Sequence, residues 1–248
     1  LHMSEGFARR VFDPSTPSVR GLDDDERALL RNVDARAFRA DPERPLRLIA
    51  ALLEEYPVSA AIVGASSLPA FIATSVFENA VLRDRLIADA FGDWLFARAG
   101  DVALIELAVA LARRRRRRRG AGVVRAPGVE GTRVAAGTLA FYADALERLR
   151  RIGPTAHDAV AHGARVDAPP DVDAREYVLV DCTGAASSGV STCAEPLFAL
   201  LSFARDAHAR DAVIAEAARL GADDDAASLV DDLVRDGLLA VSLPSTKV

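Results

Sequence analysis

The residue types that most often carry out catalysis or hold metals are few in this chain and poorly spaced. There are four histidines and two cysteines among 248 residues. His157 and His162 are five residues apart, one more than the i, i+4 spacing that places two ligands on one helix face. No His-Glu-x-x-His and no paired Cys-x-x-Cys pattern occurs. The sequence therefore predicts no metal site and no cofactor in this chain.

Serine or cysteine nucleophiles need an activating base and a defined turn. The pattern Gly-x-Ser-x-Gly is absent, and the serines between Gly184 and Gly189 have the wrong spacing for a nucleophile elbow. Cys182 and Ser188 are the candidate nucleophiles of a hydrolase or transferase, but no histidine is placed to activate them. We prefer to interpret the serines as turn residues and the cysteines as small buried side chains.

Phosphate-binding patterns are also incomplete. Gly120-Ala121-Gly122 lacks the third glycine and the following helix of a dinucleotide fingerprint, and the one lysine is Lys247, near the end of the sequence. The aspartates at 223–225 and 231–232 suggest a cation site on one helix. The preferred interpretation is a helix N-terminus stabilised by acidic residues and a solvated helix face. The motifs together favour a binding protein over an enzyme.

Charge is distributed unevenly along the chain. The net charge is −5. Residues 168–248 hold 14 acidic and 6 basic residues, which leaves 22 of the 36 acidic and 25 of the 31 basic residues elsewhere. The C-terminal third therefore carries −8 and the remainder +3. The run Arg113 to Arg119 is interpreted as a solvated helix end, with an acidic protein partner or nucleic acid as the alternatives.

Hydrophobic spacing predicts helices through the N-terminal half. Leu46, Ile49, Leu52 and Leu53 lie at three- and four-residue intervals, and further helices are expected at 84–98 and 102–118. Residues 21–120 are therefore expected to form a helical bundle. Residues 1–20 are expected to be a flexible arm that begins with a cloning scar.

The last part of the chain has a different pattern. Residues 121–167 are expected to be a connecting segment with one helix, and the prolines near 169 mark a domain boundary. From 168 to 248 the sequence predicts a strand at 177–180, a short strand near Val190, three helices and a final strand. This order is typical of a small winged-helix domain. The predicted fold is mainly α with a small α+β part.

The acidic third helix indicates what such a domain binds. Its aspartates would be repelled by DNA phosphates, so we expect no nucleic acid partner. The alternative is a transcriptional regulator with a helical sensor domain. A winged helix can instead take an extended peptide as an added strand, with the third helix lining the groove. The predicted peptide-binding residues are Tyr177, Val178, Leu179, Val180, Cys182, Leu229, Asp232 and Leu233.

Aromatic residues cluster in the N-terminal half, where most are expected in the core. Tyr56, Phe77 and Trp94 are the candidate anchors of a partner interface, because large aromatic side chains are common hot spots. No run of 18 apolar residues and no secretory signal is present, so a cytoplasmic protein without a membrane partner is expected. Because the cytoplasm is reducing, the two cysteines are expected to be reduced thiols.

Two parts of the chain resemble known families. The C-terminal part is similar to the peptide-recognition element of ribosomally made, modified natural products, a relative of the peptide chaperone in pyrroloquinoline quinone biosynthesis. The segments that carry this likeness are 177–180, 196–201 and 229–239. The N-terminal part resembles partner proteins of the multinuclear non-haem iron-dependent oxidative enzymes. Its segments are 52–57, 71–77, 90–95 and 137–142.

The resemblance implies a specific division of labour. A chain of this kind is a non-catalytic partner subunit that forms a heterodimer with a separate barrel enzyme, and that enzyme holds the iron. The recognition domain binds the leader of a precursor peptide, and the enzyme oxidatively modifies the core of that peptide. The arginine run and the long acidic third helix have no counterpart in the family pattern.

Overall fold

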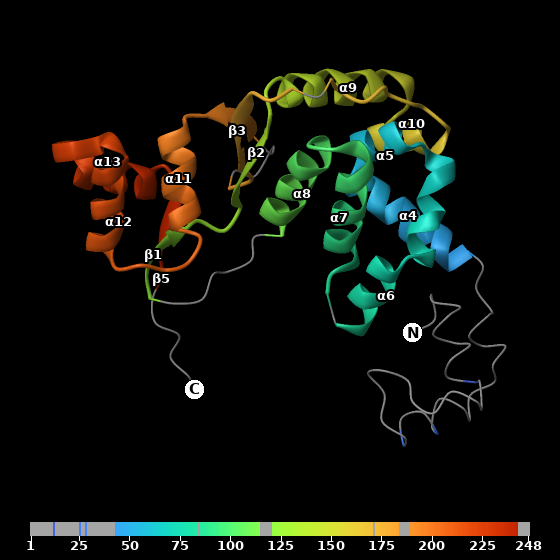
Figure 1. The fold of residues 1–248 in the computed structure, drawn as a ribbon, viewed down its shortest axis with the longest axis horizontal. Coiled ribbons are helices and arrows are strands. Elements are labelled where there is room, and N and C mark those ends of the chain that lie inside the picture. The colour runs from blue at the N-terminus through green and yellow to red at the C-terminus, as the bar shows by residue number, and fades with distance from the viewer. Residues whose placement is uncertain are drawn as a thin grey trace. The chain divides into compact units, whose positions relative to one another are not determined.

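The computed structural model describes residues 43–83, 85–114, 121–170, 172–183 and 189–242, together with Phe12, Asp25 and Ala28. The other residues of the expected arm at 1–20 lie outside this set, as do Arg115 to Arg119 of the arginine run. The described chain is mostly helical with a small sheet part, which confirms the predicted mainly α class (Figure 1).

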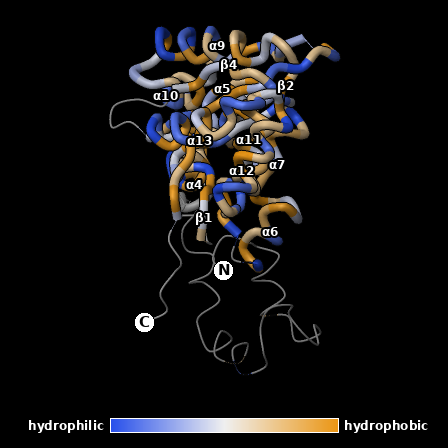
Figure 2. Tube along the Cα trace, turned by 90° about the vertical axis from the view of Figure 1, so that its left-hand side faces the viewer, coloured by the Kyte–Doolittle hydropathy of each residue, from blue (hydrophilic) through white to orange (hydrophobic). Residues whose placement is uncertain are grey.

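The chain divides into two compact units. Unit 1 comprises residues 1–103 and 144–168, and unit 2 comprises residues 104–143 and 169–248. The expected connecting segment at 121–167 is therefore divided between the two units. Helix α8 (Val102–Arg113) begins at the boundary, and helix α9 (Thr138–Ile152) continues from unit 2 into unit 1. Polar and apolar positions alternate along α9 (Figure 2).

Unit 1 is built from short helices whose ends follow local chemistry. They are α4 (Glu43–Glu55), α5 (Pro57–Val63), η1 (Ala65–Ala73), α6 (Ser75–Leu82), α7 (Ile87–Ala99) and α10 (Ala156–Ala161). Pro57 opens α5, where its fixed φ suits the first turn. Gly64 ends it with a φ of 87°. Thr74 opens α6 because its side chain accepts a hydrogen bond from the Phe77 backbone N–H at 3.3 Å. Helix α7 packs against α5 and α6, and α10 packs against α4 and α5.

The core of unit 1 is a cluster of aromatic rings. Phe71 contacts Phe77, Phe91 and Trp94 with ring centroids 5.4, 5.0 and 5.7 Å away. Tyr56 meets Phe91 edge-on at 5.6 Å, and its hydroxyl donates to the Ala88 carbonyl at 2.9 Å. Three of these four ring pairs are edge-to-face, an arrangement that aromatic pairs prefer, and the Phe71–Trp94 pair is tilted.

This cluster corrects the prediction of interface anchors. Tyr56 and Phe77 are fully buried, and Trp94 is 5% exposed. Their side chains fill the core of unit 1 and are not presented to a partner. The exposed large apolar side chains of this unit include Leu46, Leu86 and Phe96.

Unit 2 contains two small antiparallel sheets. Strand β1 (Gly122–Arg125) pairs with β5 (Leu239–Ser242). Strands β2 (Val129–Ala135), β3 (Arg175–Asp181) and β4 (Gly189–Cys193) form the second sheet in the order β2-β3-β4. Two of the five strands thus come from the expected connecting segment. Their partners lie far along the chain, so local patterns do not reveal the pairing.

Three helices follow β4 as predicted. They are α11 (Glu195–Phe203), α12 (Arg210–Ala217) and α13 (Ala226–Arg235), and a kinked turn with short helices η2 (Ala218–Ala222) and η3 (Asp223–Asp225) joins the last two. Between α11 and α12, His208 bridges to Val123 of β1 through two backbone hydrogen bonds of 2.8 and 3.0 Å.

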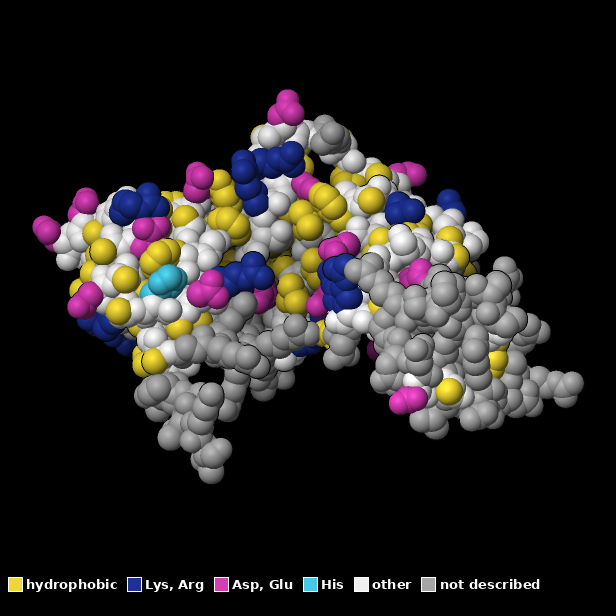
Figure 3. All heavy atoms as spheres, turned by 60° about the horizontal axis from the view of Figure 1, so that its bottom comes forward, with side chains coloured by type: hydrophobic (Ala, Val, Ile, Leu, Met, Phe, Trp, Pro, Cys, Tyr) yellow, Lys and Arg dark blue, Asp and Glu magenta, His cyan; other side chains and the backbone are white. Residues whose placement is uncertain are grey.

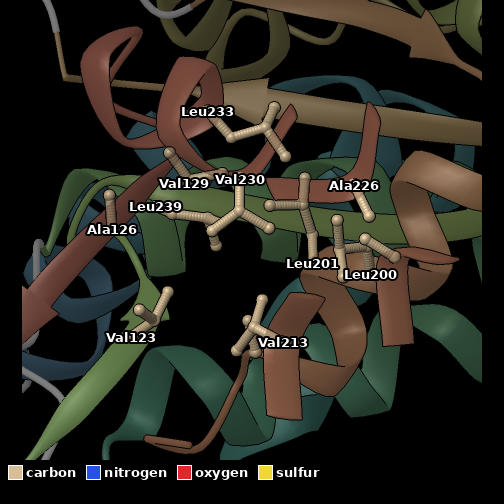
Figure 4. Close-up of a cluster of buried hydrophobic side chains, with 12 residues drawn as sticks. Val123, Ala126, Val129, Leu200, Leu201, Val213, Ala226, Val230, Leu233 and Leu239 are labelled. Atoms are coloured by element: carbon tan, nitrogen blue, oxygen red, sulfur yellow. The ribbon is translucent and has the colours of Figure 1, made fainter. Parts of the chain in front are cut away.

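The helices and strands of unit 2 enclose one buried apolar cluster. Figure 4 shows side chains from α11, α12 and α13 meeting those of β1, β2 and β5. Val230 and Val213 are fully buried at this meeting point, and Leu239 is 1% exposed. Partly buried Leu179 of β3 packs against the same cluster, so it connects both sheets to the helices.

No single helix in the described part of the chain is long and apolar enough to cross a membrane. Helices η1 and α6 reach the required length and composition only when taken together, and they are bent by 55°.

Candidate peptide-binding site

The three-stranded sheet places β4 at an open edge. Strand β3 is paired along both sides, with β2 and with β4. The predicted strand 177–180 is therefore the neighbour of an edge and cannot itself accept a further strand. Among the described residues, no strand pairs with the second side of β4. Its unpaired N–H and C=O groups form a template for an added strand.

The two outer strands of this sheet differ in how they are protected. Strand β2 carries Glu130 and the exposed Arg133, and charged side chains on an edge discourage pairing with another chain. Strand β4 has the sequence Gly-Val-Ser-Thr-Cys, with neither a charge nor a proline. Most of its residues are exposed or half-buried. Strand β4 is thus the unprotected edge.

The predicted peptide-binding residues of β3 alternate between the two faces of the sheet. Tyr177 and Leu179 lie on the face that α11 covers, and the Tyr177 ring is 5.0 Å from that of Phe198. Val178 and Val180 lie on the other face and are fully buried. These side chains therefore pack on both faces of β3.

The remaining predicted residues differ in accessibility. Cys182 and Leu233 are each 6% exposed, and Leu233 belongs to the core cluster of unit 2. On α13, Leu229 is 37% exposed, and exposed Asp232 accepts a hydrogen bond from Arg235. Of the eight predicted residues, Leu229 and Asp232 are the exposed ones.

A row of side chains crosses the sheet at the end of β4 and was not predicted. Arg133, Tyr177 and Cys193 are directly opposite one another in the strand register. The guanidinium of Arg133 lies 5.9 Å from the Tyr177 ring centre. The Tyr177 hydroxyl donates to Glu195 Oε1 at 2.5 Å, and this hydrogen bond raises the pKa of Tyr177. Only the cross-strand register brings these residues together, and the sequence pattern does not contain it.

The two cysteines are too far apart to form a disulfide. Cys193 faces Tyr177, whereas Cys182 lies five residues further along β3 and just past its end. At about 3.3 Å per residue this separation is roughly 16 Å, beyond the reach of an S–S bond. Neither cysteine forms a disulfide, and burial raises the pKa of Cys193, which disfavours its thiolate. Ser188, the other candidate nucleophile, lies outside the described residues.

The two histidines of this region lie at opposite ends of α10, His157 in its first turn and His162 at its C-cap. The Thr155 hydroxyl accepts from the Asp158 backbone N–H at 3.2 Å and donates to Asp158 Oδ2 at 2.6 Å. That side-chain hydrogen bond lowers the pKa of Asp158. His157 Nδ1 lies 3.0 Å from the same hydroxyl. Within the described ranges, no three His, Cys, Asp or Glu side chains are arranged to hold a metal ion.

Comparisons with protein-family models, with curated proteins and with solved structures give no match to this chain.

Proposed function

We propose that this chain is a non-catalytic partner subunit that binds the leader of a ribosomally made precursor peptide. The leader adds as a strand to β4 of unit 2. A separate iron-dependent oxidative barrel enzyme, bound to this chain as a heterodimer in the cytoplasm, then modifies the core of the peptide. The observation that carries the proposal is the uncharged, unprotected edge of β4 in a sheet that α11 covers on one face.

The arrangement of unit 2 supports a winged-helix interpretation. The order α11, backbone bridge at His208, α12, α13 and β5 matches the start of the winged-helix order, whereas the partner of β5 is β1, from earlier in the chain. Strand addition suits such a domain because main-chain hydrogen bonds supply affinity while side-chain positions supply specificity. Leader binding with micromolar affinity corresponds to about 8 kcal/mol. Holding the enzyme beside the leader raises the local concentration of the core peptide.

The charges of α13 weigh against the alternative of a DNA-binding regulator. Asp231 and Asp232 are exposed on this helix, and Arg210 and Arg235 are already engaged by them. Acidic and basic side chains are interspersed on the face that Figure 3 shows. Insertion of α13 into a DNA groove would bring these carboxylates against phosphates. Duplex DNA binding that weakens steeply with salt would favour the regulator instead.

The proposal is tested by co-expressing the chain with the products of its neighbouring genes and identifying stoichiometric companions by mass spectrometry. We expect an iron-containing barrel protein, and with it a short precursor peptide. Metal analysis of the complex assigns the iron to the barrel protein when this chain, purified alone, contains none. A chain that purifies without any such companion contradicts the proposal.

A further inference from the structure

Near the end of β4 lies a carboxylate, one oxygen of which has no hydrogen-bond partner among the described residues. Glu195 is exposed and is the first residue of α11, two residues past the end of β4. Its Oε1 accepts from the Tyr177 hydroxyl at 2.5 Å, which fixes the carboxylate over the sheet. Among the described residues, Oε2 of Glu195 has no hydrogen-bond or ion-pair partner. Arg133 lies on the β2 side of Tyr177, two strands away from the open edge.

The chain on either side of β4 is acidic, and the basic side chains of this sheet, Arg133 and Arg175, lie on β2 and β3. Strand β4 itself is uncharged, Asp181 of β3 is opposite its first residue, and Glu195 lies two residues past its last. Between residues 176 and 204 the sequence contains no lysine or arginine. A strand added to β4 would therefore meet the Glu195 carboxylate at one end, whereas Asp181 lies on β3, on the other side of β4. A negatively charged peptide would be repelled there and a positively charged one attracted.

We infer that the peptide bound on β4 carries a lysine or arginine whose side chain pairs with Glu195, so that Glu195 determines specificity for a basic leader. This inference rests on the proposed function and adds the charge class of the ligand. In the cross-strand row Arg133–Tyr177–Cys193, the next position belongs to the added strand and lies on the same face as Tyr177. A long basic side chain at that position reaches the vacant oxygen of Glu195. The Tyr177 hydrogen bond holds the carboxylate in place before binding.

The experiment selects peptides from a displayed library of random 15-residue sequences on the full-length chain. With the wild type, we expect enrichment of extended, β-favouring peptides that share a lysine or arginine at one fixed position. With Glu195→Arg, selection should favour aspartate or glutamate at that position. Glu195→Gln should weaken a selected basic peptide roughly three- to tenfold, because a charged hydrogen bond becomes a neutral one.

Glu216→Gln is the matched control. It removes the same charge from α12 of the same unit, where Glu216 is paired with Arg219 at 2.6 Å. This variant should bind the basic peptide with unchanged affinity. Circular dichroism of each variant checks that the fold is retained.

The outcomes separate the two proposals. Selected peptides with no charge preference, or with the same basic residue on wild type and Glu195→Arg, overturn the role of Glu195 and leave peptide binding intact. If neither the wild type nor Glu195→Arg enriches any peptide, the proposed function and this inference are both contradicted.

Discussion

At the scale of single residues, Asp223 holds an unfavourable backbone conformation. Its φ is 40° and its ψ is −123°, in a region that suits the first central glycine of a type II′ turn. Among the described residues other than glycine, it alone has a positive φ. Asp223→Gly should therefore stabilise the protein by about 1 kcal/mol, because relief of strain outweighs the entropy that glycine loses on folding.

Urea unfolding of the full chain measures this change. Asp225→Gly is the control, since Asp225 has an ordinary φ of −90° and its replacement should cost about 0.5–1 kcal/mol. Equal destabilisation by both substitutions would show that Asp223 is not strained.

Gly92 makes room for the ring of Tyr56. A Cβ at position 92 would lie 2.8 Å from the Tyr56 hydroxyl oxygen and 3.2 Å from two ring carbons. Gly92→Ala should destabilise the protein by about 1–3 kcal/mol, because the packed core must shift to accept the methyl group. Tyr56→Phe removes the closest of these contacts, so the alanine should cost less in that background. A double-mutant cycle by thermal unfolding checks this, and additive losses would contradict it.

Residue-scale predictions from the sequence succeeded unevenly for a physical reason. Apolar spacing identifies which face of a helix is hydrophobic, and it correctly favoured burial for most aromatic residues of unit 1. It does not distinguish a ring that packs inside from a ring that anchors a partner. Tyr56, Phe77 and Trp94 were assigned to an interface, and their burial and their ring contacts with Phe71 and Phe91 place them in the core instead.

At the scale of elements, neighbouring residues of β4 direct their backbone N–H groups to opposite edges. One of the pair Ser191→Pro and Thr192→Pro removes a donor to β3, and the other removes a donor to the open side. The substitution that removes the donor to β3 should lower the melting temperature by several degrees. The substitution that removes the donor to the open side should leave the melting temperature nearly unchanged and weaken peptide binding.

Calorimetric melting and peptide binding, measured on both variants, test this prediction. Unfolding of both variants would show that both sides of β4 are paired. Unchanged peptide affinity in the variant that stays folded would show that the peptide binds elsewhere.

The sequence also predicted the helices and strands of unit 2 better than it predicted which strands pair with each other. The strand at 177–180 and the three helices after β4 are present where the sequence indicated them. The position of β3 between two other strands depends on pairing with residues 129–135, whose partners lie 40 to 52 residues later. Such pairing, and with it the row from Arg133 to Glu195, depends on three-dimensional register and leaves no local pattern.

At the scale of the whole molecule, unit 2 takes strands from both sides of the 144–168 segment. Residues 168–248 alone lack β1 and β2, so β5 loses its partner and β3 loses one of two. We expect this fragment to lack a cooperative thermal transition, whereas a fragment of residues 104–248 retains one. Far-ultraviolet circular dichroism on heating compares them. A sharp transition in the shorter fragment would show that the earlier strands are dispensable.

The most direct test of the central claim is amide hydrogen exchange of the full chain with and without a bound peptide, either the co-purified precursor or a peptide selected from the library. The account predicts that alternate amides of residues 189–193, those facing the open edge, exchange at least tenfold more slowly when the peptide is bound, because they gain strand hydrogen bonds. Protection confined to α13 or to unit 1, with β4 unchanged, would contradict strand addition at this edge.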